Sequence, residues 1–238
     1  MQKIKYCVFL CAFLSIVGWG PGPIIDALFT PSVTIPPRAK DWIDQELLII
    51  DAQANNLDPK VLTLGLLAYL HAREKGFLHK PLLTLIDYSK PSNERRLWVV
   101  DMRTNRVLFN TWVSHGKNSG DVLATSFSND PGSLKSSIGV FLTVNSYVGE
   151  NGYSLRLIGL EQGFNDHALS RSIVVHGAWY SDPEVIKKYG QLGRSWGCPS
   201  VRPQETRPLI NTIKDNSLVV VYYPDRNWLK TSTFLITG

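Results

Sequence analysis

The order of apolar and polar residues divides the chain into a helical part and a part made of strands. In residues 38–54 apolar side chains recur every three or four positions, the spacing of one face of a helix. Residues 61–75 continue in the same way after Asp58 and Pro59, which suit an N-cap and a first helical position, and Gly76 ends the pattern. The sequence therefore predicts two helices here.

From residue 82 the pattern changes to short runs rich in β-branched and aromatic residues, which are typical of strands. The tight connections at 102–106 and 149–152 favour antiparallel hairpins over a parallel sheet with crossover helices. The predicted fold is α+β and mainly β, an antiparallel β-sheet or sandwich with a small N-terminal helical subdomain. The runs cover residues 82–89, 96–102, 106–114, 138–148, 153–160, 172–179 and 217–224.

The first twenty residues have the features of a secretion signal. Two lysines precede an apolar run from Tyr6 to Val17, and glycines and Pro21 follow it. The run is shorter than the roughly 20 residues of a comfortable membrane span, yet no small-residue cleavage site stands out. Residues 1–20 are therefore predicted to be a signal peptide or an uncleaved anchor, which would associate the protein with a membrane.

Composition narrows the range of partners. With 44% hydrophobic and 19% charged residues, the 238-residue chain is suited to one substantial globular core. The net charge of +5 and the pI near 9.1 fit an anionic partner such as a phospholipid surface or an acidic envelope polymer. No dense lysine or arginine run occurs, so no nucleic-acid partner is expected.

Cys198 is the candidate nucleophile. Cys7 and Cys11 lie inside the predicted targeting segment, which leaves Cys198 without a mature partner for a disulfide. It follows Gly-Arg-Ser-Trp-Gly in a predicted loop instead of lying in an apolar run, so we expect a reactive thiol. His176, at the end of a predicted strand, is the candidate base. With an imidazole beside it, Cys198 is expected to react with electrophiles well below its ordinary pKa of about 8.5.

Two glycines flank this pair. Gly177 lets the chain turn after His176, so that a backbone carbonyl can hold the second ring nitrogen. Gly197 lets backbone N–H groups at 196–198 converge beside the sulfur as an oxyanion hole. No close ligand spacing such as CxxC or HxxxH occurs among the histidines and Cys198, so neither a metal nor another cofactor is expected.

Several motifs in order resemble one family. "VLFNTWVSHGKNSG", "TSFSNDPGSLKSSIG", "VVHGAWY" and "GRSWGCPSV" are similar to the catalytic domain of the murein L,D-transpeptidases, the YkuD-like cysteine transpeptidases. The likeness runs from residue 83 to residue 224. It departs from the common pattern at Trp196, where a histidine is frequent, and at Pro199, where an arginine is frequent.

The resemblance implies a function and a location. Cys198 would attack the carbonyl between the third residue of a peptidoglycan stem peptide and its terminal D-alanine, forming a thioester. His176 would act as base and then acid, the Gly177 carbonyl would orient it, and the Gly197 and Cys198 amides would bind the oxyanion. Resolution by an amine of a second stem or of an envelope protein makes a transpeptidase. Resolution by water makes an L,D-carboxypeptidase, and a non-catalytic envelope-binding module is also open. The protein would be exported to the periplasm or cell envelope of a bacterium.

Other candidate positions surround the motif. The two arginines would bind a stem carboxylate in a bidentate way, and the aromatic residues would line the groove. The candidate substrate-binding residues are Arg194, Ser195, Trp196, Tyr180, His115 and Arg202. The predicted organisation is a targeting segment at 1–20, a helical subdomain at 38–80, a catalytic domain at 83–224, and a final strand or tail at 225–238.

Overall fold

The computed structural model describes residues 37–236. The predicted targeting segment, with Cys7 and Cys11, lies outside the described residues. The helices are α2 (Pro37–Asp51), α3 (Pro59–Glu74), α4 (Pro183–Tyr189), α5 (Pro203–Ile213) and α6 (Arg226–Thr231), with short 3₁₀ turns η1 (Lys117–Ser119) and η2 (Trp179–Ser181). The strands are β1 (Leu82–Asp87), β2 (Leu97–Asp101), β3 (Arg106–Thr111), β4 (Gly139–Gly149), β5 (Gly152–Gly159), β6 (Val174–Gly177), β7 (Ser200–Val201) and β8 (Leu218–Tyr222).

The two predicted N-terminal helices are confirmed as α2 and α3. The side chain of Asp58 accepts a hydrogen bond from the backbone N–H of Lys60, and Pro59 occupies the first helical position. Within residues 37–236 no helix combines the length and the apolar character that crossing a bilayer requires.

All strands form one sheet in the order β3-β2-β1-β8-β4-β5-β6-β7. The seven predicted strands are present, and the α+β, mainly β fold is confirmed. The purely antiparallel arrangement is wrong at two places, because β1 pairs with β8 and β6 pairs with β7 in parallel. Neither parallel pair is joined by a short turn, so the hairpin signals that predict antiparallel pairing do not apply to them.

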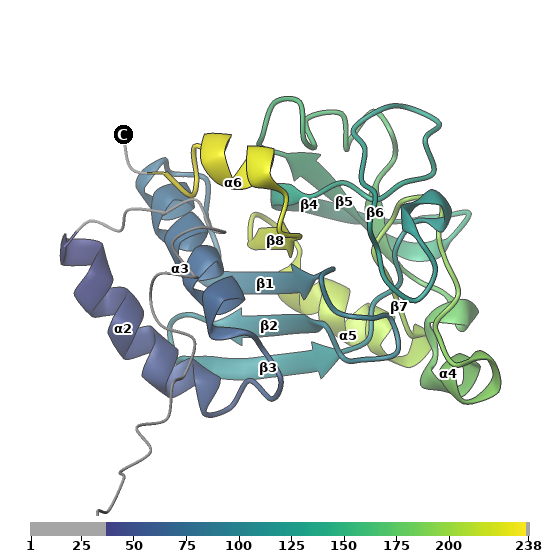
Figure 1. Cartoon of the computed structure of the whole chain (residues 1–238), viewed down its shortest axis with the longest axis horizontal. Coiled ribbons are helices and arrows are strands. Elements are labelled where there is room, and N and C mark those ends of the chain that lie inside the picture. Colours follow the sequence, from purple (N-terminus) through teal and green to yellow (C-terminus); the bar gives the residue numbers. More distant parts are fainter. Residues whose placement is uncertain (1–36, 237–238) are drawn as a thin grey trace, which may run out of the picture. The chain divides into compact units, whose positions relative to one another are not determined.

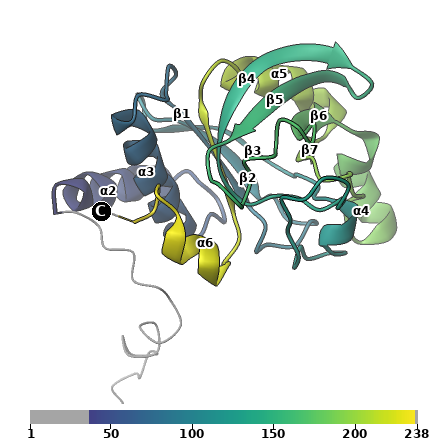
Figure 2. The same cartoon turned by 90° about the horizontal axis from the view of Figure 1, so that it is seen from above.

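The middle of the sheet is buried on both faces. Along β1 and β8, alternate side chains point to opposite sides, and both sides are apolar. Leu83 and Leu85 pack in one cluster with α2, α3 and α6, whereas Ile86 packs in the other with α5. Figure 1 shows α3 beside β1, and Figure 2 shows α5 next to the long β4–β5 hairpin. The helices therefore fix the strands that carry the site.

The connection between β6 and β7 brings distant residues together. A parallel pair needs a crossover of about a dozen residues or more, and the chain from residue 178 to residue 199 supplies it through η2 and α4. The N-cap side chain Asp182 accepts from the N–H of Glu184 at 3.0 Å, and Gly190 ends α4 with a left-handed φ of 76°. As a result His176 on β6 is the register partner of Ser200 on β7.

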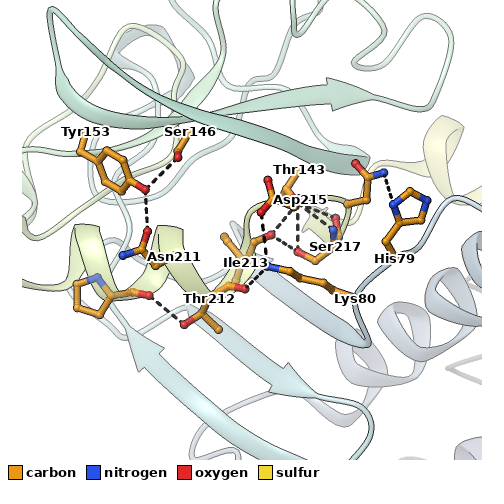
Figure 3. A network of polar contacts seen from close by, with 12 residues as sticks. His79, Lys80, Thr143, Ser146, Tyr153, Asn211, Thr212, Ile213, Asp215 and Ser217 are labelled. Atoms are coloured by element: carbon orange, nitrogen blue, oxygen red, sulfur yellow. Dashed lines mark hydrogen bonds and ion pairs between the residues drawn. The ribbon is translucent and has the colours of Figure 1, made fainter.

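A polar network attaches α5 to the hairpin beside the site (Figure 3). Thr143 lies where the β4–β5 register shifts, and its hydroxyl donates to the carbonyl of Ile213 at 2.7 Å. The Tyr153 hydroxyl lies 2.7 Å from Asn211 Oδ1 and 2.9 Å from Ser146 Oγ. Because α5 starts directly after β7, these contacts also hold the end of the segment that carries Cys198.

The C-terminal segment is a packed helix, where the sequence left a strand or a tail open. Trp228 and Leu229 of α6 are buried against the core that α3 and the sheet share. Trp228 Nε1 donates to the buried Glu161 carboxylate at 2.8 Å, which also accepts from the N–H of Val140 at 2.6 Å and from Ser232. Burial raises the pKa of Glu161.

Candidate active site

His176 is held on β6 with one ring nitrogen fixed. The residue is 4% exposed, and its Nδ1 lies 3.1 Å from the carbonyl oxygen of Gly177. A carbonyl only accepts, so Nδ1 carries the proton and the lone pair is on Nε2. A Cβ at Gly177 would lie 2.3 Å from Thr206 Oγ1, which explains the glycine beside the histidine.

Cys198 lies in the loop just before β7 and is half-buried. Its Sγ accepts from the backbone N–H of Val174 at 3.5 Å and donates its proton to the carbonyl of Ser172 at 3.6 Å. Both partners belong to the segment that leads into His176. The sulfur is therefore positioned by the same strand as the imidazole.

Cys198 and His176 share one pocket of about 300 Å³. The pocket is bounded by the turn between β4 and β5 on one side and by the loop before β7 on the other. The structure thus brings together the two residues on which the predicted chemistry depends. The other lining residues are Glu150, Asn151, Tyr180, Arg194, Ser195 and Trp196.

Burial sets the protonation of the pair. It lowers the pKa of His176 below its ordinary value, although the Gly177 carbonyl acts in the opposite direction. It raises the pKa of the Cys198 thiol, against the effects of the Val174 N–H and Arg171. The resting pair is therefore a neutral thiol and a neutral imidazole. Desolvation of the sulfur therefore acts against the expected reactivity of the thiol well below pH 8.5, which stays a prediction.

Gly197 shapes the loop that presents the sulfur. Its φ of 125° disfavours other residues, and a Cβ would lie 2.8 Å from the carbonyl oxygen of Lys135. Its N–H donates to Ser195 Oγ at 3.1 Å, and that hydroxyl donates to the carbonyl of Cys198 at 2.6 Å. In the described part of the chain the amide of Cys198 has no such partner. Of the two predicted oxyanion donors, only the Cys198 amide is free in this state.

The long loop at 114–137 supports the Cys198 loop. The N–H of Ser195 donates to the carbonyl of His115 at 2.9 Å, and the N–H of Lys117 donates to the carbonyl of Ser195 at 2.7 Å. Ser136 Oγ donates to the carbonyl of Gly197 at 2.9 Å. The loop therefore determines the backbone path on either side of Trp196.

His115 does not lie in the pocket, contrary to its place among the predicted substrate contacts. Its side chain is fully buried, at 0% exposure, with Nδ1 2.8 Å from Arg96 Nη2 and Nε2 3.2 Å from the carbonyl of Gly120. Burial and the adjacent Arg96 lower its pKa to about 4. Both ring nitrogens are occupied, so His115 is a neutral support of the loop.

The other predicted substrate contacts divide into two groups. Tyr180, Ser195 and Trp196 line the pocket, and Trp196 is 78% exposed. Arg194 also lines it, but its guanidinium pairs with Asp121. Arg202 is not among the lining residues. It lies 3.8 Å from Asp182 and 4.0 Å from Glu205, so its charge is already compensated.

No sequence pattern singles out Arg171, which directly precedes Ser172, the residue whose carbonyl contacts Cys198 Sγ. Its contacts are to residues of the long loop, and no spacing rule relates the two segments.

Among residues 37–236 no group of three His, Cys, Asp or Glu side chains is placed to hold a metal ion.

Comparison with known families identifies the domain. The model of the L,D-transpeptidase catalytic domain matches residues 53–222, which include α3 and the whole sheet. The chain therefore belongs to the L,D-transpeptidase catalytic domain family. Comparison with the curated proteins gives no match.

The solved structures to which the chain is similar include three L,D-transpeptidases. An L,D-transpeptidase from Mycobacterium smegmatis is 15% identical, with a TM-score of 0.37 over 60% of this chain and 59% of that chain. The L,D-transpeptidase LdtMt1 in complex with imipenem has the same scores and coverage. An L,D-transpeptidase from Stackebrandtia nassauensis is 14% identical, with a TM-score of 0.34 over 82% of this chain and 97% of that chain. The chain thus spans 59% of the length of the first two proteins.

Proposed function

We propose that the protein is a cysteine-dependent murein L,D-transpeptidase that cross-links or remodels peptidoglycan through a thioester on Cys198. The observation that carries the proposal is the pocket in which Cys198 lies with a histidine whose Nε2 is left as a proton acceptor. Membership of the L,D-transpeptidase catalytic domain family supports the reaction type.

The first half-reaction forms the acyl-enzyme. The donor is a stem peptide, and its reacting carbonyl joins the third residue to the terminal D-alanine. The thiol turns from the Ser172 carbonyl toward the pocket, Nε2 of His176 takes its proton, and the sulfur attacks the carbonyl carbon. The C–N bond then breaks, and Nε2 returns the proton to the departing amine of D-alanine.

The negative charge that develops on the carbonyl oxygen needs hydrogen-bond donors. The Cys198 amide is available for it. The Gly197 amide becomes a second donor only if its hydrogen bond to Ser195 Oγ breaks. Ser195 therefore accepts from the Gly197 amide while no oxyanion is present. One oxyanion donor is typically worth about 2.7 to 4 kcal/mol in the transition state.

The second half-reaction releases the acyl group. An amine of a second stem, or of an envelope protein, loses a proton to Nε2 and attacks the thioester carbonyl, the C–S bond breaks, and Nε2 returns the proton to the sulfur. Since both substrates belong to the cell wall, the proposal requires export, for which residues 1–20 are the candidate signal or anchor.

Product analysis tests this function. The purified protein is incubated with tetrapeptide muropeptides, and the products are separated by mass. Cross-linked dimers that disappear in C198A support the transferase. Tripeptides alone would show that water resolves the acyl-enzyme and would overturn the transferase in favour of an L,D-carboxypeptidase. Unchanged muropeptides, bound equally by the wild type and C198A, would favour a non-catalytic binding module.

A further inference from the structure

Arg171 makes an unusual set of contacts next to the candidate nucleophile. Nη1 donates to the carbonyl of Ser128 at 2.7 Å and to Ser137 Oγ at 2.6 Å. Nη2 donates to the carbonyl of Lys135 at 2.7 Å and to Ser133 Oγ at 3.1 Å. All four acceptors lie on the segment 128–137, and all are neutral.

These contacts connect Arg171 to the Cys198 loop from two directions. The Lys135 carbonyl that Arg171 holds is the atom that a Cβ at Gly197 would meet at 2.8 Å. On the other side, Ser172 follows Arg171 directly, and its carbonyl lies 3.6 Å from Cys198 Sγ. Arg171 thus holds the Lys135 carbonyl that faces Gly197 and directly precedes the residue that contacts the sulfur.

In the part of the chain that the structure describes, Arg171 differs from Arg194, the arginine in the pocket, in that it has no carboxylate partner. Within the described residues its guanidinium has no carboxylate at ion-pair distance, whereas Arg194 in the pocket is paired with Asp121. His176 and the tyrosines near the sulfur are neutral at physiological pH, because burial lowers the pKa of His176 and raises those of Tyr88 and Tyr180. The charged and titratable groups that face the sulfur or lie on elements packed against it are His176, Tyr180, Arg194, Glu150, Tyr88, Arg171, Asp130 and Lys135.

We propose that Arg171 is a positioning residue that holds the segment 128–137 against Gly197 and supplies the unpaired positive charge that stabilises the thiolate of Cys198. An opposite charge near an acid favours its ionised form, and the desolvated surroundings of the sulfur strengthen that effect. The inference rests on the proposed function for its biological meaning. Its physical content, the reactivity of one thiol, can be measured without peptidoglycan.

The test is the pH dependence of iodoacetamide alkylation in the full-length protein. The Cys198 peptide is quantified by mass spectrometry, because the chain also contains Cys7 and Cys11. In R171Q we expect alkylation at pH 8 to be about tenfold slower and the onset to move to higher pH. R171K keeps the charge and should restore most of the rate. R103Q, in the exposed β2–β3 turn, removes the same charge and should react like the wild type.

A second pair of variants leaves Arg171 in place, so the test survives if R171Q does not fold. S137D sets a carboxylate beside Nη1 and neutralises the guanidinium, whereas S137N has similar size without charge. We expect slow alkylation in S137D and wild-type alkylation in S137N.

Two results would overturn the inference. One is a wild-type rate in a folded R171Q or in S137D. The other is equal slowing in R171K and R171Q, which would leave Arg171 a purely structural role. Alkylation that depends on Arg171 in a protein that makes no acyl adduct would instead refute only the proposed function.

Discussion

Two buried histidines lie close to the Cys198 loop, and they differ in what their ring nitrogens contact. His115 uses both nitrogens, one with Arg96 and one with the Gly120 carbonyl. His176 uses only Nδ1, on the Gly177 carbonyl, and borders the pocket that contains Cys198. Burial lowers the pKa of both, so both are neutral near pH 7.

This difference supports the proposed role of His176 as the base and leaves His115 as a support of the loop. A histidine with two occupied nitrogens holds the backbone in place and has no free lone pair for a substrate proton. A histidine with one nitrogen on a carbonyl and the other toward a pocket has the arrangement that general base catalysis requires. Since both side chains are buried, the two histidines differ in the hydrogen bonds of their ring nitrogens and not in their exposure.

The largest expected effect on activity comes from replacing His176 by asparagine, with the same replacement of His115 as the comparison. H176N should lower kcat/KM for cross-linking by about 10³-fold, since positioned acid–base groups typically contribute 10²–10⁴-fold. H115N keeps an acceptor for Arg96 and should keep kcat/KM near the wild-type value. Steady-state kinetics with muropeptides measures kcat/KM of both variants. An equal loss of kcat/KM in H176N and H115N would contradict the different roles of the two histidines.

The next effect concerns the loop that His115 supports. In G197A the new Cβ meets the Lys135 carbonyl at 2.8 Å in a backbone conformation with φ of 125°, so the sulfur must shift. A misplacement of about 1 Å can cost about 10²-fold in rate. G190A is the control, because it also has positive φ but open space around the Cβ. Turnover that is similar in both variants would show that the close approach at Gly197 is unimportant.

A stability experiment isolates His115. Its pKa of about 4 in the folded protein lies below its ordinary 6.5, so the unfolded chain binds the extra proton between these values. Stability should therefore fall as the pH falls from 6.5 to 4, by about 3 kcal/mol from this residue alone. Denaturant unfolding of wild type and H115N gives the difference. Parallel curves over that window would contradict the buried neutral His115.

The smallest expected effect is on the pH profile of activity. His176 must be neutral to accept a proton, and burial lowers its pKa. The acid limb of kcat/KM should therefore fall at a midpoint below the ordinary 6.5. A midpoint above that value would mean that the imidazole is stabilised in its charged form, as an ion pair with Cys198.

Local sequence patterns predicted much of the fold and the central pair of residues. The runs rich in β-branched and aromatic residues at 82–89 and 217–224 predict β1 and β8, and each strand places apolar residues on both faces. The strand before His176 and the glycine-rich setting of Cys198 are also local signals. The parallel pairing of β6 with the two-residue β7 has no local signal, since it depends on where the crossover through η2 and α4 returns to the sheet.

Other features depend on contacts between distant segments. Nothing near His115 indicates that Arg96 will bury beside it, and nothing near Arg171 indicates that the segment 128–137 will surround its guanidinium. The desolvation that raises the pKa of the Cys198 thiol has the same origin, because it depends on how the loops cover Cys198. Trp228 packs in the core and donates to Glu161, from a loop far away in sequence, which no local pattern in residues 225–236 reveals.

The central claim is that Cys198 carries the acyl group during the reaction. Its most direct test is the mass of the intact protein, followed by peptide mapping, after brief exposure to a murein tetrapeptide. We expect an adduct of the tripeptide acyl group on Cys198, with loss of D-alanine, and none in C198A. An adduct on another residue, or D-alanine release by C198A at the wild-type rate, would contradict the claim.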